Sequence, residues 1–249
     1  MHPVNKVLSK VGLRLTRPLE SVEIPAEFRK EYNRRLNFLL KESGDFNVFR
    51  DFQYDAGDHP GTYMNFECEF AARHLRMSNP TTVLDIGSHR LFVLGLLAGY
   101  KVTTLDVRPR ESRLENETIV TSDAKQLDIA SDSFDMVVSL CTLEHFGLGR
   151  YGDEFDLDGD KKAFKEMIRV LKPGGRVVFS TTVTRSTPSL AFNAHRIYSH
   201  RMIRAFCEKL ECVEEGFFSN ETGSGCSHEQ VTDEPARWDV YCGCWMKSL

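Results

Sequence analysis

The sequence predicts a doubly wound α/β fold with a mostly parallel sheet. The prediction rests on three acids, Asp85, Asp106 and Asp123, each of which stands at or just past the end of a short apolar or β-branched run. The acids are 21 and 17 positions apart, which leaves room for one short crossover between successive parallel strands. In open α/β sheets, nucleotide-like ligands bind outside the carboxyl ends of the strands. The pattern therefore predicts a site for an adenosine-type cofactor at this edge.

Length and composition fit one large α/β domain with at most an appendage. The chain has 249 residues, of which 41% are hydrophobic and 27% are charged. Its 32 basic and 36 acidic residues give a net charge of -4. This balance gives no electrostatic reason to expect nucleic acid as a partner, so we expect small molecules instead.

The cysteines and the hydropathy of the chain indicate the cellular compartment of the protein. The seven cysteines lie mostly inside apolar runs, which is typical of reduced core thiols and predicts a cytoplasmic protein. The sequence has no run of 18 apolar residues and no apolar core of a secretion signal. Residues 6–17 alternate basic and apolar side chains, so they form either a partly ordered basic arm or a segment in weak contact with an anionic membrane surface.

Two helices are predicted before the sheet, at residues 25–41 and 63–77, from the near-helical spacing of their apolar side chains. A stretch rich in Asp, Gly and Pro, residues 51–61, separates them. We interpret residues 1–79 as an arm and helical flank or lid. Residues 80–249 are then the domain that contains the sheet.

Within this domain, residues 133–140 are the candidate central strand, because their apolar run lacks the alternation of a half-exposed strand. A helix is predicted from Asp160, as its N-cap, to Leu171, with Pro173-Gly174-Gly175 as the stop. The other expected elements are a strand at residues 176–182, a helix capped by Ser199 and running to about residue 210, and strands near residues 213–218 and 238–246.

Five motifs resemble, in order, those of class I S-adenosylmethionine-dependent methyltransferases. They are Val83-Leu-Asp-Ile-Gly87, Thr104-Leu-Asp106, Ser122-Asp-Ala124, Ser133-Phe-Asp-Met-Val-Val138 and Val170-Leu-Lys-Pro-Gly-Gly175. The resemblance runs from residue 80 to the end of the chain. It implies a Rossmann-like, seven-stranded sheet with an antiparallel strand near one edge, S-adenosylmethionine as cofactor and S-adenosylhomocysteine as product.

Two segments resemble a narrower, uncharacterised methyltransferase-like family of bacterial glycan gene clusters. They are Glu144-His-Phe-Gly-Leu-Gly-Arg-Tyr-Gly-Asp153 and Phe192-Asn-Ala-His-Arg-Ile-Tyr198. The biochemical roles of this family are largely unassigned, so it implies little about substrate.

The class I resemblance also implies cofactor contacts. Asp106 would accept the two ribose hydroxyls, and its alternative role is to cap the next turn. Asp123 would take the adenine amine with help from the Ala124 amide, unless it is a solvated loop acid. Asp85 would orient the glycine turn and reach the amino-acid end of the cofactor, where Tyr63 would also contribute if it is not simply a packed aromatic. The remaining implied contacts are Gly87, Ser88, Val107 and Leu140.

The glycine loop departs from the usual pattern. Dinucleotide sites need G-x-G-x-x-G so that the backbone can approach a pyrophosphate, whereas this loop reads Gly87-Ser-His-Arg-Leu91. The departure argues against NAD or FAD, while a sulfonium cofactor has no phosphate to hold. His89 and Arg90 either face solvent or close on the carboxylate of the cofactor.

The catalytic candidate is His145, which follows the fourth strand and whose imidazole suits a general base; its alternative role is to hydrogen-bond the loop. Glu144 would orient it or act as a structural cap. The acceptor-binding candidates would suit a sugar, phosphorylated or carboxylated molecule. They are Arg150 and Tyr151 in the loop expected after the fourth strand, and His195, Arg196 and Tyr198 in the loop expected after the fifth.

The acids between Asp153 and Asp160 do not form an EF-hand, because Lys161 and Met167 stand where glycine and glutamate are needed. They read as a solvated loop, with a magnesium site as the alternative, and we predict no structural metal. The expected function is methyl transfer to a small molecule, foremost a sugar or glycan-precursor hydroxyl. The alternatives are an acceptor of secondary metabolism at nitrogen or carbon, a non-catalytic scaffold, and an NAD-dependent oxidoreductase.

Overall fold

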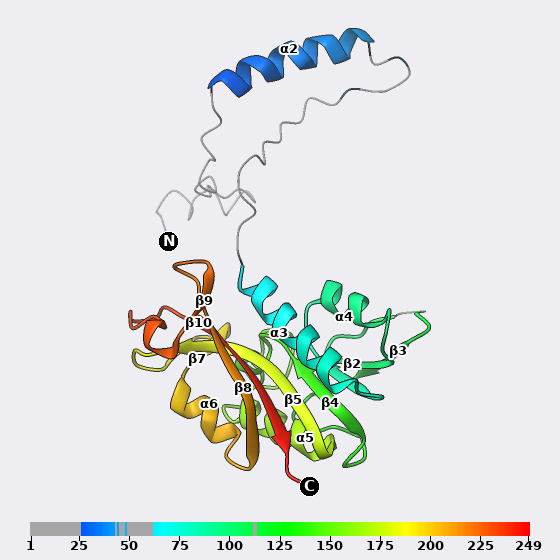
Figure 1. The fold of residues 1–249 in the computed structure, drawn as a ribbon, viewed down its shortest axis with the longest axis vertical. Coiled ribbons are helices and arrows are strands. Elements are labelled where there is room, and N and C mark those ends of the chain that lie inside the picture. The colour runs from blue at the N-terminus through cyan, green and yellow to red at the C-terminus, as the bar shows by residue number, and fades with distance from the viewer. Residues whose placement is uncertain (1–25, 43, 45–47, 49–61, 112–113) are drawn as a thin grey trace, which may run out of the picture. The chain divides into compact units, whose positions relative to one another are not determined.

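The computed structural model describes residues 26–42, 44, 48, 62–111 and 114–249 (Figure 1). The chain divides into two compact units, residues 1–59 and 60–249, and each is described by itself. The basic segment at residues 6–17 and the predicted loop at residues 51–61 lie outside the described residues.

The first unit contains the helix α2 (Ala26–Glu42), which confirms the helix predicted at residues 25–41. None of its side chains is buried, and Glu31 pairs with both Arg34 and Arg35 along its surface. Across the described part of the chain, no helix has the length and apolar character needed to cross a membrane.

The second unit is built on one sheet with the strand order β3-β2-β1-β4-β5-β10-β8-β9 (Figure 1). The first five strands in this order are parallel, and β10 runs antiparallel between β5 and β8. The strands are β1 (Val83–Ile86), β2 (Val102–Asp106), β3 (Glu117–Thr121), β4 (Phe134–Ser139), β5 (Leu171–Thr184), β8 (Leu210–Ser219), β9 (Ser224–Cys226) and β10 (Asp239–Lys247).

The mostly parallel α/β sheet is therefore confirmed, and it carries three short strands beyond the expected seven. One is β9, at the edge of the sheet. The others form a hairpin of β6 (Ser189–Ala191) and β7 (His195–Ser199), which is joined to the sheet where β7 pairs with the end of β5. The hairpin occupies a segment that the sequence analysis treated as a loop.

Helices cover both faces of the sheet, as expected for buried parallel strands (Figure 1). On one face, α3 (Tyr63–Ser78) and α4 (Arg90–Leu96) contribute Phe70, Leu75 and Leu96 to a buried cluster. On the other face, α5 (Gly159–Val170) and α6 (His200–Phe206) contribute to a second cluster through Phe164, Met167 and Ile203.

The ends of two helices test the sequence rules. Ser199 caps α6 as predicted, because its Oγ accepts the Met202 N–H at 3.3 Å, but the helix ends at Phe206 rather than near residue 210. Asp160 is not the N-cap of α5: the cap is Asp158, and Asp160 turns inward to accept the Tyr198 hydroxyl at 2.8 Å. Pro173-Gly174-Gly175, which was expected to end the helix, lies inside β5 instead, and β5 follows α5 without a loop.

Candidate active site

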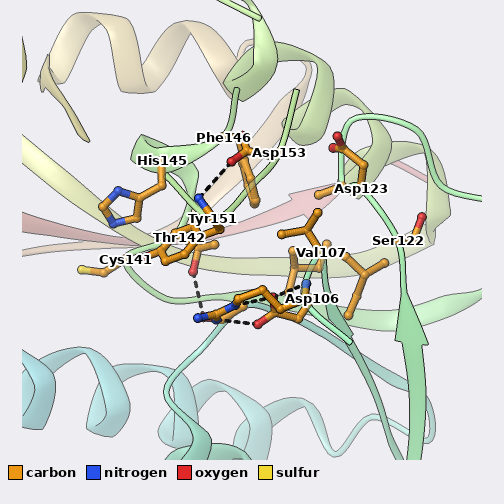
Figure 2. A pocket seen from close by; sticks show the side chains of 15 residues that line it. Asp106, Val107, Ser122, Asp123, Cys141, Thr142, His145, Phe146, Tyr151 and Asp153 are labelled. Carbon is orange, nitrogen blue, oxygen red and sulfur yellow. Dashed lines mark hydrogen bonds and ion pairs between the residues drawn. The ribbon is translucent and has the colours of Figure 1, made fainter. Parts of the chain in front are cut away.

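Two adjoining pockets lie at the carboxyl ends of the parallel strands. The carboxylate pocket contains Asp106, Asp123 and Asp153 (Figure 2). The histidine pocket contains His89, His145 and His195. Residues shared by both are Gly87, Asp106, Arg108, Cys141, His145 and Tyr151. The shared residues make the two pockets one site with two compartments.

The structure brings two of the three strand-end acids together. Asp106 ends β2 and Asp123 follows β3, and both line the carboxylate pocket with Val107 and Ala124. Asp85 lines neither pocket. It is 2% exposed beneath the glycine turn, where its Oδ1 accepts the Ser88 N–H at 3.3 Å and its Oδ2 has no partner. Burial raises the pKa of Asp85 to about 7.

Asp106 is held by Arg108 in a two-pronged arrangement. The Arg108 Nε donates to Oδ1 at 3.0 Å and its Nη2 donates to Oδ2 at 2.8 Å, while the guanidinium lies 4.7 Å from the centre of the Tyr151 ring. Burial raises the pKa of Asp106, but the hydrogen bonds and charge of Arg108 outweigh it and hold this pKa below its usual range. Asp106 is thus an ionised acceptor. Its Oδ1 also accepts the Arg108 backbone N–H at 2.9 Å, whereas the exposed Arg108 side chain can be displaced by a ligand.

Asp123 is partly exposed, and Lys125 contacts both of its carboxylate oxygens. Its Oδ1 accepts the Lys125 N–H at 2.9 Å, and the Lys125 ammonium lies 3.3 Å from its Oδ2. Its side chain is 35% exposed, so a ligand in the carboxylate pocket can reach it.

The glycine turn is fixed by its contact with the end of β4. Gly87 has φ = +70°, and a Cβ added there would meet the Thr142 Cγ2 at 2.6 Å. Ser88 ties the turn to the same strand end, because its Oγ accepts the Leu140 N–H at 3.1 Å. Gly87 lines both compartments, and Ser88 and Leu140 line the histidine pocket. Gly87 thus lets the backbone approach a ligand closely, and the turn that follows it lacks the further glycines of a phosphate-binding loop.

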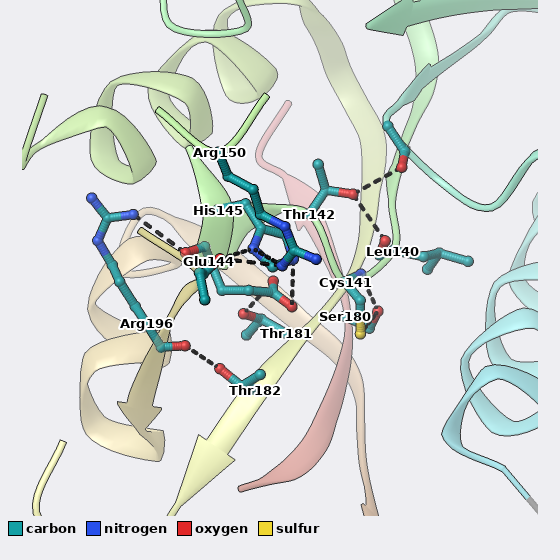
Figure 3. Close-up of polar contacts among 12 residues, drawn as sticks. Leu140, Cys141, Thr142, Glu144, His145, Arg150, Ser180, Thr181, Thr182 and Arg196 are labelled. Carbon is teal, nitrogen blue, oxygen red and sulfur yellow. Dashed lines mark hydrogen bonds and ion pairs between the residues drawn. The ribbon is translucent and has the colours of Figure 1, made fainter. Parts of the chain in front are cut away.

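His145 is placed to act as a neutral base. It lies at the end of η2 (Leu143–His145), and burial lowers its pKa to about 4. Its Nδ1 is hydrogen-bonded to the Ala194 carbonyl oxygen, which requires the proton on Nδ1 and leaves the Nε2 lone pair available. The Glu144 Oε1 lies 3.9 Å from Nε2 (Figure 3).

Aromatic side chains form a wall of the histidine pocket. Tyr63 meets Trp238 edge to face at 5.7 Å between ring centres, and Trp238 meets His195 at 6.0 Å. His145 continues the row, 6.2 Å from His195 and 5.8 Å from Tyr151. Arg150 is exposed at this pocket, with its guanidinium 5.3 Å from the Tyr151 ring centre.

Two of the predicted acceptor residues are not brought to the site. Successive side chains of a strand point to opposite faces. His195 therefore faces the pocket while Arg196 and Tyr198 turn to the other side of β7, where both contact Asp160. Arg196 is 8% exposed and donates to the carbonyl oxygens of Phe146 at 2.7 Å and Leu157 at 3.1 Å. Through these hydrogen bonds Arg196 stabilises the loop after β4.

The acidic loop before α5 is neutralised by lysines. Asp156 accepts from the Lys162 ammonium at 2.7 Å, and Asp158 accepts from Lys161 at 2.6 Å. Within the described residues, no group of three or more His, Cys, Asp or Glu side chains has the arrangement of a metal site.

Several residues of the site were missed in the sequence. Arg108 and Thr142 lie within two residues of the predicted contacts Val107 and Leu140. The rule that ligands bind at the carboxyl ends of parallel strands could have identified them. Trp238 reaches the pocket from just before β10, and Glu67 lies on the buried side of α3. Their placement depends on tertiary packing, and no local pattern in the sequence indicates it.

A comparison with protein families matches residues 100–230 to the family described as Caenorhabditis protein of unknown function, DUF268. The match covers just over half of the chain. The chain belongs to this family. The matched segment includes Asp106, Asp123 and His145 but begins after the glycine turn. No curated protein matches the chain.

Solved structures similar to this chain share its fold. One is a 1,6-didemethyltoxoflavin N1-methyltransferase of Burkholderia thailandensis with bound 1,6-didemethyltoxoflavin and S-adenosylhomocysteine, at 18% identity, 94% coverage of both chains and a TM-score of 0.55. The N-methyltransferase NodS of Bradyrhizobium japonicum, in complex with S-adenosylhomocysteine, covers 73% of this chain and 87% of its own at 21% identity and a TM-score of 0.50. The [4+2]-cyclase SpnF covers 89% and 94% at 14% identity, with a TM-score of 0.58. At these identities the likeness establishes the methyltransferase-like α/β fold alone.

Proposed function

We propose that this protein is an S-adenosylmethionine-dependent methyltransferase that acts on a small molecule. The observation that carries the proposal is that Asp106 and Asp123 line one pocket at the carboxyl ends of β2 and β3. Two similar structures are methyltransferases with S-adenosylhomocysteine bound, which supports this cofactor.

The hydrogen-bonding groups of the site fit adenosine and methionine. Asp106 would accept both ribose hydroxyls, with Arg108 turning away from it, and Asp123 with the Ala124 amide would bind the adenine edge. Gly87 permits close approach where the two compartments meet, and Tyr63, Ser88 and Leu140 line the side where the methionine part would lie. When bound, the cofactor supplies an electrophilic methyl group.

The acceptor would occupy the histidine pocket, beside Arg150, Tyr151 and His195. His145 would take the proton of an acceptor hydroxyl at Nε2, because Nδ1 is committed to Ala194 and the ring is uncharged at neutral pH. The same burial that lowers its pKa makes it a weaker base than a free imidazole. A proton acceptor of this kind is needed when a hydroxyl is methylated, and it would serve the sugar or glycan-precursor hydroxyl of this proposal. The enzyme's other contribution is to align the acceptor with the methyl group.

Calorimetry with S-adenosylmethionine and S-adenosylhomocysteine tests the cofactor. We expect binding of both, and Asp106→Ala should raise Kd about 10- to 100-fold, because charge-assisted hydrogen bonds contribute about 1.5 to 3 kcal/mol. Asp128→Ala, which removes an exposed aspartate outside both pockets, is the matched control and should leave Kd unchanged. Equal affinity of the Asp106→Ala variant and the wild type would contradict the assignment.

A further experiment separates methyl transfer from a binding role in the same fold, since one similar structure is named as a cyclase. Methyl-labelled cofactor is incubated with the protein and the small-molecule fraction of a cell extract. Release of S-adenosylhomocysteine with label in an acceptor supports the enzyme. Tight cofactor binding without any release in such mixtures supports the non-catalytic alternative.

A further inference from the structure

Glu67 is a buried acid with an incomplete set of partners. It lies on the face of α3 that packs on the sheet and is 0% exposed. The Ser180 hydroxyl donates to its Oε2, while its Oε1 is buried and has no hydrogen-bond partner. No Lys, Arg or His of the described residues forms an ion pair with it. A buried carboxyl without a cation is unusual in a purely structural role, because packing α3 needs only its apolar residues.

Glu144 is a second buried acid beside the same pocket. It is 2% exposed, and its Oε2 accepts the Thr181 hydroxyl at 3.0 Å (Figure 3). Burial raises the pKa of Glu144 to about 8, and burial likewise raises the pKa of Glu67. Glu144 therefore holds a proton at neutral pH, and the nearby charges of Arg150 on Glu144 and of His89 on Glu67 do not offset the effect of burial. A protonated carboxyl still accepts at one oxygen and donates at the other, so it can pair with a hydroxyl or amine of a ligand.

The two carboxyls reach one pocket from opposite faces of the sheet. Ser180 and Thr181 are consecutive in β5, so their hydroxyls point to opposite faces, one toward α3 and one toward η2. Both acids nevertheless line the histidine pocket, which lies past the ends of β1 and β4 and beside the last residues of β5. The pocket therefore has two carboxyls along its inner side and the ring row of Tyr63, Trp238 and His195 as a wall.

We propose, resting on the methyltransferase function above, that Glu67 and Glu144 bind the hydrogen-bond donors of the acceptor and so select a molecule that presents O–H or N–H groups. The free Oε1 of Glu67 receives one donor, and Glu144 receives a neighbouring one beside His145. A molecule without such donors leaves these buried acids unpartnered and is rejected. Glu67 is thus a specificity-determining residue supplied by the helix before the sheet.

The test measures acceptor use and cofactor binding separately. The probes are methyl-labelled S-adenosylmethionine with the fraction of a cell extract below about 1 kDa, and S-adenosylhomocysteine for calorimetry. We expect the labelled product to be methylated on oxygen or nitrogen. Glu67→Gln should raise the acceptor KM at least 10-fold, with the Kd for S-adenosylhomocysteine within twofold of the wild type. Glu69→Gln, an exposed acid on the same helix, is the control and should match the wild type in both.

The melting temperature of each Glu67 variant shows whether a raised KM reflects lost acceptor binding or a folding defect. Glu67→Asp keeps the carboxyl but shortens its reach, so it should fold and show a raised KM like Glu67→Gln. Wild-type KM in variants that bind S-adenosylhomocysteine normally, or a product methylated on a carbon that carries no donor, overturns this inference alone. Absence of cofactor binding by the wild-type protein overturns the proposed function together with it.

Discussion

At the scale of single residues, Gly87 occupies a position that a side chain cannot share. Its φ of +70° disfavours any L residue, and a Cβ would lie 2.6 Å from the Thr142 Cγ2. Gly87→Ala should therefore lower the free energy of unfolding by about 1 to 3 kcal/mol in urea titrations.

The matched control is Gly95→Ala. Gly95 lies in the helix α4 with nothing within 4 Å of an added Cβ, so this change should leave stability unchanged or raise it by up to about 1 kcal/mol. If both substitutions changed stability equally, the role given to the glycine turn would be wrong.

Asp85 makes folding stability depend on pH. Its folded pKa, raised by burial to about 7, lies above the ordinary value of 3.8 for an aspartate. Between these two pH values the folded protein therefore holds a proton that the unfolded chain has released. Titration of Asp85 therefore does not lower the free energy of unfolding at low pH. It lowers this free energy progressively as pH rises through that window, and the loss is complete above about pH 7.

Asp85→Asn removes this cost while keeping an oxygen for the Ser88 N–H. The difference in unfolding free energy between the variant and the wild type should favour the variant by a larger amount at pH 8 than at pH 5, by one to several kcal/mol. Urea titrations at the two pH values measure it. A difference that stays constant with pH would show that Asp85 does not titrate in this range.

At the scale of elements, two arginines near β7 have different roles, one in the strand and one in the loop after η2. Arg196 braces the loop after β4 through the carbonyl oxygens of Phe146 and Leu157, whereas Arg150 is exposed at the histidine pocket. Arg196→Ala should lower the free energy of unfolding by about 1.5 to 3 kcal/mol, because it removes charged donors from buried carbonyl groups. Arg150→Ala should change stability by less than about 0.5 kcal/mol and raise the acceptor KM instead.

Urea titrations and steady-state kinetics on both variants separate the two roles. An Arg150→Ala variant that loses stability, or an Arg196→Ala variant with wild-type stability, would reverse the assignment.

The region around β7 also shows which parts of the site can be predicted from the sequence. The strand-end rule depends only on local runs and their spacing, and it located Asp106 and Asp123 correctly at one pocket. The sequence also predicts that the segment around His195 lies near the site, but it predicts a loop where the structure has the strand β7. Which of its side chains face the pocket follows from the alternation of a strand that forms only by pairing with β5. Glu67 and Trp238 depend in the same way on long-range packing.

At the scale of the whole molecule, α3 decides where the functional domain begins. The sequence grouped this helix with residues 1–79, but its Phe70, Ala71 and Leu75 are buried against one face of the sheet, and its Tyr63 and Glu67 line the histidine pocket. The compact unit that contains the sheet accordingly starts near residue 60.

Two truncated chains test this boundary. Residues 60–249 should unfold cooperatively and bind S-adenosylhomocysteine within about threefold of the full chain, because every residue of both pockets lies within them. Residues 80–249 should lose cooperative unfolding, since removing α3 exposes side chains whose burial contributes about 1.5 to 3 kcal/mol each for the larger ones, a large share of a typical domain's stability. Thermal melts and calorimetry distinguish the outcomes. If the shorter chain melted cooperatively and bound the cofactor, α3 would be an accessory flank, and the acceptor selectivity assigned to Glu67 would have to come from the sheet edge alone.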